Sequence, residues 1–223
     1  MNKGVSIVVG ATGFIGQSIY KELKQLGYQV IGTSTKGSKE ENLEPLDLSD
    51  RKSITAFAER FEKVDNLIIA AGREPQSSLM ELEEAHLEKM IAIHYAGPLW
   101  LIKHLQAKFS SEASILFCSS VAAYKGSYDP TYASLKGAVN SLVRTLAREL
   151  APKVRVNAIA PGLVKDSPVY NRMTQDFRER HANASLTKTL LTEKELTDMF
   201  ITMISQKNLN GQIIHLNGGQ YFG

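Results

Sequence analysis

A tyrosine and a lysine four residues apart, Tyr132 and Lys136, form the pair in this sequence that is best suited to acid–base chemistry. On a helix this spacing puts both side chains on one face, with Cβ atoms about 5–6 Å apart. A phenol with a pKa of about 10 exchanges protons poorly at neutral pH, and we expect the neighbouring ammonium to lower that pKa. The pair predicts proton transfer to or from an alcohol oxygen while a hydride moves at the carbon atom.

Two adjacent serines, Ser119 and Ser120, end an apolar stretch that precedes the tyrosine. We interpret this stretch as a buried strand, so a hydroxyl at its end is positioned to hold a substrate oxygen. The neighbouring Cys118 is the only cysteine, which excludes an intramolecular disulfide, and its apolar surroundings favour a small core residue over a reactive thiol.

A glycine-rich turn follows the predicted first strand, with the sequence Gly10-Ala11-Thr12-Gly13-Phe14-Ile15-Gly16. Glycines at these places permit a tight turn and a close approach of the backbone to a pyrophosphate. The predicted helix that starts near Phe14 offers free N–H groups and the positive end of its dipole to the phosphates. The turn therefore predicts a dinucleotide site.

The second predicted strand ends in three hydroxyl residues and a cation, Thr33-Ser34-Thr35-Lys36, where NAD-binding proteins carry an acidic residue. A carboxylate there would repel the 2′-phosphate of NADP, whereas hydroxyls and an ammonium can bind it. This predicts NADP(H) in preference to NAD(H), although NAD(H) stays possible. The alternative is that Lys36 is only a solvated loop lysine.

Short β-branched runs alternate with helical patterns along the whole chain, which predicts an α/β fold with a parallel sheet and helices on both faces. Most strands are continuous apolar runs, as expected when both faces are covered. The predicted strands are Val5–Val9, Gln29–Thr33, Glu44–Leu46, Asn66–Ala71, Ser114–Ser119, Arg155–Ala160 and Gln212–Leu216. The predicted helices span residues 14–26, 51–62, 80–108, 131–151 and 192–204.

The composition excludes several classes of protein. The 223 residues carry a net charge of only +3 and are 43% hydrophobic, which favours one globular domain over 1–223 and gives no indication of a nucleic-acid partner. No apolar run is long enough to span a membrane, no signal peptide is apparent, and no His, Cys and Asp cluster has metal-ligand spacing. We expect a cytoplasmic protein without a bound metal.

Taken together, these motifs resemble those of the short-chain dehydrogenase/reductases over nearly the whole chain. The matching elements are Gly10–Gly16, Asp47-Leu48, Ala71-Gly72, Ser119-Ser120-Val121, Tyr132-x-x-x-Lys136, Asn157–Gly162, Gly211-Gln212 and Gly218-Gly219. The resemblance implies a Rossmann-type sheet of about seven parallel strands and reversible hydride transfer with NAD(P)H. The cofactor contacts that it implies include Asp47 and Leu48 beside the adenine, Ala70, Ala71 and Gly72 after the fourth strand, Pro161 and Gly162, and Val164 near the nicotinamide carboxamide.

The resemblance also implies roles for the reactive residues. Tyr132 is then the catalytic acid/base, Lys136 binds the nicotinamide ribose and lowers the tyrosine pKa, and Ser120, rather than Ser119, orients the carbonyl. His94 stands where the family has an asparagine that anchors a water in a proton relay. Either His94 takes part in that relay and adds a pH dependence near pH 6–7, or it only fills a helix kink, or catalysis is weakened.

Our leading hypothesis is an NADPH-dependent reductase of a small-molecule carbonyl, or the reverse alcohol dehydrogenase, with a substrate lid at 163–190. His181 in this segment is a minor candidate for substrate contact, and Met173 and Phe177 are candidates to close over it. The glycine turn keeps an epimerase or dehydratase open, and His94 keeps a non-enzymatic NADP(H)-binding sensor or scaffold open. The resemblance implies a homotetramer or homodimer that packs the helices at 80–108 and 131–151.

Overall fold

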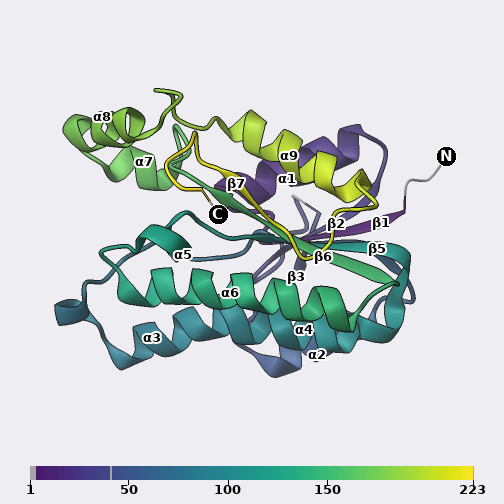
Figure 1. Ribbon diagram of the computed structural model, residues 1–223. Coiled ribbons are helices and arrows are strands. Elements are labelled where there is room, and N and C mark those ends of the chain that lie inside the picture. Colours follow the sequence, from purple (N-terminus) through teal and green to yellow (C-terminus); the bar gives the residue numbers. More distant parts are fainter. Residues whose placement is uncertain (1–3, 41, 223) are drawn as a thin grey trace.

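The computed structural model describes residues 4–40 and 42–222, which form a twisted parallel sheet of seven strands between two layers of helices (Figure 1). The strand order is β3-β2-β1-β4-β5-β6-β7. The strands are β1 Val5–Val9, β2 Gln29–Ser34, β3 Leu43–Pro45, β4 Val64–Ile69, β5 Phe109–Cys118, β6 Val154–Pro161 and β7 Ile213–Leu216. This confirms the predicted doubly wound α/β fold.

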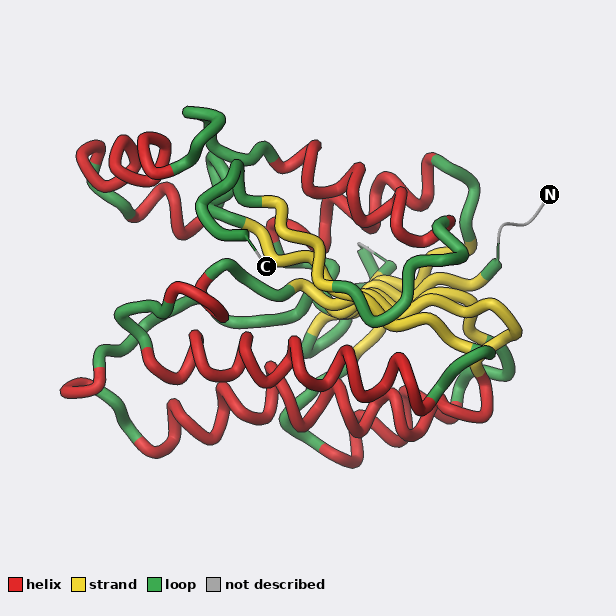
Figure 2. Tube along the Cα trace, viewed as in Figure 1, coloured by secondary structure: helices red, strands yellow, loops and turns green. Residues whose placement is uncertain are grey.

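Helices cover both faces of the sheet (Figure 2). One face carries α1 (Phe14–Gln25) and α9 (Glu193–Ser205), and the other carries α2 (Arg51–Glu59), α4 (Gly97–Leu105) and α6 (Pro130–Glu149). The remaining helices are α3 (Glu84–Ile91), α5 (Ala122–Lys125), α7 (Pro168–Arg172) and α8 (Gln175–Ala184). Figure 1 shows α7 and α8 extending beyond the sheet on the side where α5 lies.

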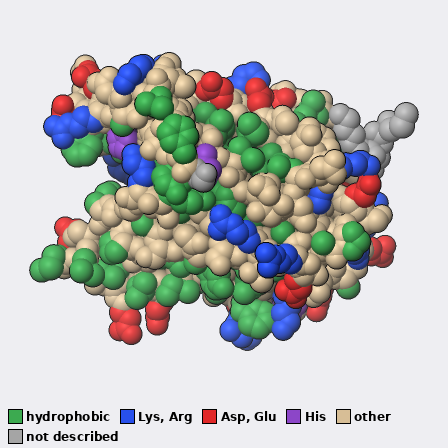
Figure 3. All heavy atoms as spheres, viewed as in Figure 1, with side chains coloured by type: hydrophobic (Ala, Val, Ile, Leu, Met, Phe, Trp, Pro, Cys, Tyr) green, Lys and Arg blue, Asp and Glu red, His purple; other side chains and the backbone are tan. Residues whose placement is uncertain are grey.

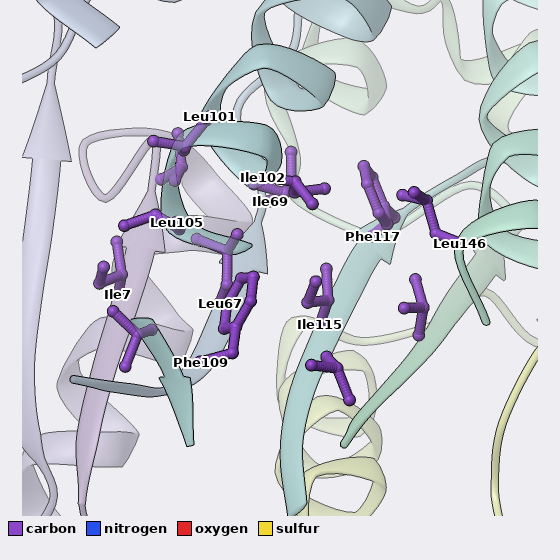
Figure 4. Packing of buried hydrophobic residues seen from close by; sticks show 14 of the residues in the cluster. Ile7, Leu67, Ile69, Leu101, Ile102, Leu105, Phe109, Ile115, Phe117 and Leu146 are labelled. Carbon is purple, nitrogen blue, oxygen red and sulfur yellow. The ribbon is translucent and has the colours of Figure 1, made fainter. Parts of the chain in front are cut away.

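The central strands are apolar on both faces, and successive side chains enter different cores. On β4, Leu67 and Ile69 pack with α2 and α4, whereas Ile68 packs with α1 and α9. Figure 4 shows Leu67 beside Phe109 and Leu105 in the first of these cores. All three β4 residues are at most 3% exposed, so a rigid sheet supports whatever follows its carboxyl ends.

The single helix predicted over 80–108 is wrong. The chain forms a 3₁₀ turn at Leu79–Glu81, then α3, a π-helical stretch at Ala92–Ala96, α4 and a second 3₁₀ turn at Gln106–Lys108. Pro98 has no backbone N–H, so it cannot donate the α-helical hydrogen bond to the carbonyl of His94. The wider turn directly before Pro98 buries the imidazole, which is 4% exposed.

The segment 163–190, which shows no clear periodicity in the sequence, contains α7 and α8. Each begins at a hydroxyl residue that caps the first turn: Ser167 accepts from the N–H of Tyr170, and Thr174 accepts from the N–H of Phe177. Ser167-Pro168 is a helix-start signal that local sequence analysis can find, but helices this short leave no periodic pattern.

Candidate active site

The glycine-rich turn lies at the point where the strand order reverses, between β1 and β4. Gly10 has φ +85°, and a Cβ there would lie 2.7 Å from Cα of Ala71. A Cβ on Gly16 would lie 2.2 Å from the carbonyl oxygen of Gly10. Gly13 precedes α1 without a capping side chain, which leaves the N–H groups of the first helical turn available to phosphates. The backbone here fits the pyrophosphate of a dinucleotide.

The hydroxyl run at the end of β2 divides into an inner and an outer part. Thr33 is 1% exposed, and its hydroxyl accepts a hydrogen bond from the N–H of Gly10 at 3.3 Å, so it supports the turn from inside. Ser34 is half-buried, and Thr35 and Lys36 are exposed. The structure therefore leaves the last three, not all four, accessible to a phosphate.

The predicted adenine-side residues also differ in accessibility. Asp47 is half-buried, and its carboxylate accepts hydrogen bonds from the N–H and the hydroxyl of Ser49 at 2.8 and 2.6 Å. Leu48 is buried against the backbone of Gly97. These contacts fix the loop after β3, while the outer edge of Asp47 stays open to solvent.

A cavity of about 530 Å³ opens at the carboxyl ends of β1, β4, β5 and β6. The predicted site residues that line it are Gly13, Phe14, Ile15, Ala70, Gly72, His94, Ser120, Tyr132, Lys136, Pro161, Gly162 and Val164. The other predicted cofactor residues do not line it: Gly10, Thr12, Gly16, Thr33, Ser34, Thr35, Lys36, Asp47, Leu48 and Ala71. The predicted reacting residues thus converge on one cavity together with the middle of the glycine turn, whereas the residues predicted for the adenine end lie outside its lining.

The polar side chains of Lys136, Tyr132 and Ser120 meet in this cavity. The ammonium Nζ of Lys136 donates to the carbonyl of Cys118 at 2.7 Å and lies 5.5 Å from the ring centroid of Tyr132. Ser119 donates its hydroxyl to Asn140 at 2.6 Å and is thereby occupied inside the protein. Ser120 lies on the cavity wall, where its hydroxyl accepts from the N–H of Ala122 at 3.1 Å.

Burial controls protonation at this cluster. It raises the pKa of Tyr132 to about 12, and hydrogen bonding to Ser120 opposes the shift without cancelling it. Burial also lowers the pKa of Lys136. The expectation that Lys136 lowers the tyrosine pKa is wrong for this structure, because the ammonium is directed to the carbonyl of Cys118 instead of the phenol oxygen.

His94 lies under the same cluster. Its Nε2 accepts a hydrogen bond from the N–H of Arg73 at 2.9 Å, and its ring meets that of Tyr132 edge to face at 5.9 Å between centroids. A Cβ on Gly72 would lie 2.9 Å from the imidazole Cε1. Burial and the nearby Lys136 lower the histidine pKa to about 3. The expected pH dependence near pH 6–7 is therefore wrong, because the imidazole is neutral throughout that range.

Comparison with known proteins decides the family. A family model described as enoyl-(acyl carrier protein) reductase matches residues 10–220. The chain belongs to the short-chain dehydrogenase/reductase family. It is 30% identical to the uncharacterized oxidoreductase YmfI of Bacillus subtilis over 98% of this chain and 99% of that one. It is 28% identical to the 3-oxoacyl-[acyl-carrier-protein] reductase FabG of Staphylococcus epidermidis over 99% of this chain and all of that one.

Solved structures of the family share the fold. A short-chain dehydrogenase/reductase of Brucella melitensis superposes with a TM-score of 0.87 at 27% identity, covering 100% of this chain and 98% of that one. A small-chain dehydrogenase in complex with NADPH superposes with a TM-score of 0.84 at 26% identity, covering 98% and 99%. These relatives make the chain an NAD(P)-dependent oxidoreductase and favour that function over an epimerase, a dehydratase or a non-enzymatic sensor.

The sequence analysis missed a buried carboxylate, that of Asp129, which accepts hydrogen bonds from backbone N–H groups next to this short-chain dehydrogenase site. Asp129 is fully buried and accepts from the N–H groups of Tyr132 at 2.9 Å, Gln76 at 2.8 Å and Ser77 at 3.3 Å. It thereby joins the first turn of α6 to the loop after β4. The sequence signal was present, because Asp129-Pro130 is a helix cap followed by proline at the first helical position.

Three further histidines lie outside the reacting cluster. His86 is half-buried, and its Nε2 lies 3.9 Å from a carboxylate oxygen of Asp129. His104 is exposed, and His215 packs against Tyr124 and Tyr221 as a strand residue would.

The lid segment contributes one wall of the cavity. Val169, Met173 and His181 line it, whereas Phe177 is 52% exposed and lies outside the lining. An ion pair between Arg172 and Glu74 joins α7 to the loop after β4.

Within residues 4–40 and 42–222, no cluster of three or more His, Cys, Asp or Glu side chains is arranged to hold a metal. The same residues include no helix that is long and apolar enough to cross a membrane.

Proposed function

We propose that this enzyme reduces the carbonyl group of a small molecule with NADPH, and that Tyr132 supplies the proton. The observation that carries the proposal is the convergence of Tyr132, Ser120 and Lys136 on one cavity beside the glycine turn. When bound, the nicotinamide supplies the hydride to the carbonyl carbon. The chain's own residues then have to hold the carbonyl oxygen and protonate it.

The roles follow from the surroundings of each group. Ser120 has its hydroxyl on the cavity wall and holds the carbonyl oxygen, while Ser119 is occupied by Asn140. Because burial raises the pKa of Tyr132 to about 12, the phenol carries its proton at neutral pH, as reduction requires. Lys136 binds the nicotinamide ribose, and its ammonium is oriented by the hydrogen bond that it donates to the carbonyl of Cys118.

His94 acts as a neutral member of the site. Its Nε2 holds the backbone of Arg73, so the ring is fixed against Tyr132. Because Nε2 accepts from Arg73, the proton of the neutral imidazole is on Nδ1, which can donate a hydrogen bond to a water next to the tyrosine and lysine without adding a charge. This supports a role in which His94 positions a relay water and does not titrate between pH 6 and 7.

NADPH is preferred to NADH in this proposal. The end of β2 offers Ser34, Thr35 and Lys36 and no carboxylate, so nothing there repels a 2′-phosphate. The glycine turn and the start of α1 bind the pyrophosphate, Asp47 and Leu48 flank the adenine, and Val164 contacts the carboxamide. A relative of known structure is described as a complex with NADPH, which agrees with this preference.

Substitution of the tyrosine tests the proposal. Tyr132→Phe keeps the ring that packs against His94 and removes the proton, so kcat/KM for a carbonyl substrate falls by at least about 100-fold. Binding of NADPH, followed by its fluorescence, stays within about twofold, since any phenol contact to the cofactor is minor beside the phosphate contacts. The matched control is Tyr170→Phe on α7, which leaves both quantities unchanged. Full activity of Tyr132→Phe would contradict the proposed role of the phenol.

A further inference from the structure

Among the described residues, the basic side chains that line the cavity are Arg73, His94, Lys125, Lys136 and His181, and the only carboxylate in the lining is that of Glu74. Glu74 is neutralised by its ion pair with Arg172, so the lining has no unpaired acidic group. Lys136 and His94 belong to the site described above, but Lys125 and His181 have no assigned role.

Lys125 and His181 line the cavity from two different helices, α5 and α8. Lys125 is the last residue of α5, directly after the strand end that carries Ser120, and His181 lies in the last two turns of α8 in the lid. Gln220 donates to the carbonyl of His181 at 3.1 Å and holds this part of α8 against the C-terminal segment. Figure 3 shows basic and histidine side chains gathered at the hollow beneath the end of the molecule that α7 and α8 form.

These two groups repel each other when both are charged. Burial lowers the pKa of His181, and the positive charge of Lys125 lowers it further. Among the described residues neither side chain has a carboxylate within ion-pair distance. The Lys125 ammonium thus lines the cavity without a counter-charge and favours a ligand that supplies negative charge, while the neutral imidazole of His181 offers an N–H donor.

Apolar side chains form part of the same lining. They include Val121, Ala122, Val169 and Met173. A ligand that fills this space needs an apolar body, with polar groups only at its two ends.

From this arrangement we infer that the substrate is an oxo acid, whose carboxylate binds between Lys125 and His181 while its carbonyl lies at Ser120 and Tyr132. Lys125 provides a charge-assisted hydrogen bond, and His181 on α8 donates a second one. The apolar chain between the two groups contacts Val169 and Met173. This inference rests on the proposed carbonyl reduction and assigns Lys125 and His181 as specificity-determining residues.

Matched substrates test the inference. NADPH oxidation is measured with a series of methyl-ketone acids that begins with acetoacetate and lengthens by one methylene group at a time, each beside its methyl ester. For the chain length that fits, we expect kcat/KM of the acid to exceed that of the ester by about tenfold or more. Lys125→Met removes this preference by raising KM for the acid and leaves the ester unchanged. Lys125→Arg restores most of it, because the charge is kept.

A control variant excludes a change in overall charge as the cause. Lys153 is an exposed lysine beyond the far end of α6, away from this cavity, so Lys153→Met removes one positive charge and leaves the preference for acids intact. Equal kcat/KM values for acids and esters at every length, unaffected by Lys125→Met, would overturn the inference and leave the carbonyl reductase standing.

A binding measurement separates this inference from the proposed function. Hexanoate and methyl hexanoate are titrated calorimetrically into the protein in the presence of NADP⁺. We expect binding of the carboxylate only, with about tenfold weaker affinity in Lys125→Met. Lys125-dependent binding without reduction of any ketone would keep the anion site and reject the carbonyl reductase. Absence of hexanoate binding in a protein that reduces neutral ketones would reject the anion site alone.

Discussion

At the scale of single residues, the protonation of His94 has a consequence for stability. Its pKa of about 3 in the folded protein lies below the usual value of about 6.5. The unfolded chain therefore binds a proton that the folded protein excludes when the pH lies between these two values. This stabilisation is fully present above pH 6.5 and is lost as the pH falls towards 3.

We expect the free energy of unfolding to fall by about 2 kcal/mol between pH 6.5 and pH 5 through this histidine alone. His94→Asn has no such group, so its unfolding free energy changes less over the same range. Urea denaturation of both proteins at the two pH values measures the difference. His104→Asn, which removes an exposed histidine from the same helical region, is the control and keeps the wild-type pH dependence. An identical pH dependence in wild type and His94→Asn would show that the imidazole is not held neutral.

The reacting residues illustrate what a sequence can specify at this scale. The types and spacing of Tyr132 and Lys136 predicted a reacting pair, and the family resemblance added Ser120 in preference to Ser119; all three line one cavity. Their pKa values were not predictable, because these depend on how deeply each group is buried and where its hydrogen bonds go. The orientation of Lys136 towards Cys118 involves a contact between a helix and a strand that no local pattern encodes.

At the scale of elements, Asp129 joins two parts of the site that local sequence leaves independent. One carboxylate oxygen caps α6 through Tyr132, and the other accepts from Gln76 and Ser77. Asp129→Asn keeps a good helix cap but has a single acceptor oxygen, so the N–H groups of the loop lose their partner. We expect a loss of about 1–3 kcal/mol in unfolding free energy.

The same substitution should also weaken substrate binding, because the loop after β4 carries cavity residues such as Pro75. We expect KM for the carbonyl substrate to rise more than kcat falls. Asp50→Asn is the matched control: Asp50 caps α2 through Lys52 and is exposed, and asparagine caps equally well. Equal losses of stability and unchanged kinetics in the two variants would mean that Asp129 only caps its helix.

Elements were predictable where their signals are local. The order of strands and main helices follows from apolar runs and caps, and the boundaries differ from the structure by a few residues, most at the start of β5. The local pattern did not predict the π-helical stretch at Ala92–Ala96, because an apolar, helix-forming sequence continues through it; the kink at His94 was suggested by the family resemblance. In the local sequence only Pro98 signals this break, and the burial of His94 beneath Tyr132 is a tertiary contact.

At the scale of the whole molecule, the parallel sheet brings the carboxyl ends of four strands to one cavity while the helices bury its faces. β1 and β4, where the strand order reverses, supply the glycine turn and the Ala70–Gly72 loop. This convergence follows from topology and was predictable once the alternating order of strands and helices was recognised. The association of chains through the helical segments at 80–108 and 131–151 stays a prediction.

Cofactor binding is the whole-molecule property that tests the proposed preference for NADPH, because a ligand that binds only the folded chain stabilises all of it. At a concentration about 100 times its Kd, NADPH raises the unfolding free energy by about 2.7 kcal/mol. For a domain of this size that corresponds to a rise in Tm of about 5–10 °C.

NADH reaches the same rise only at much higher concentration, because Ser34, Thr35 and Lys36 have no 2′-phosphate to bind. Lys36→Glu places a carboxylate at this position and reverses the order of the two nucleotides in a thermal-shift titration, whereas Lys39→Glu, three residues further along the same loop, preserves it. Stabilisation by NADH at the lower concentration in the wild-type protein would reject the NADPH preference and leave the proton chemistry at Tyr132 intact, since the two depend on opposite ends of the cofactor site.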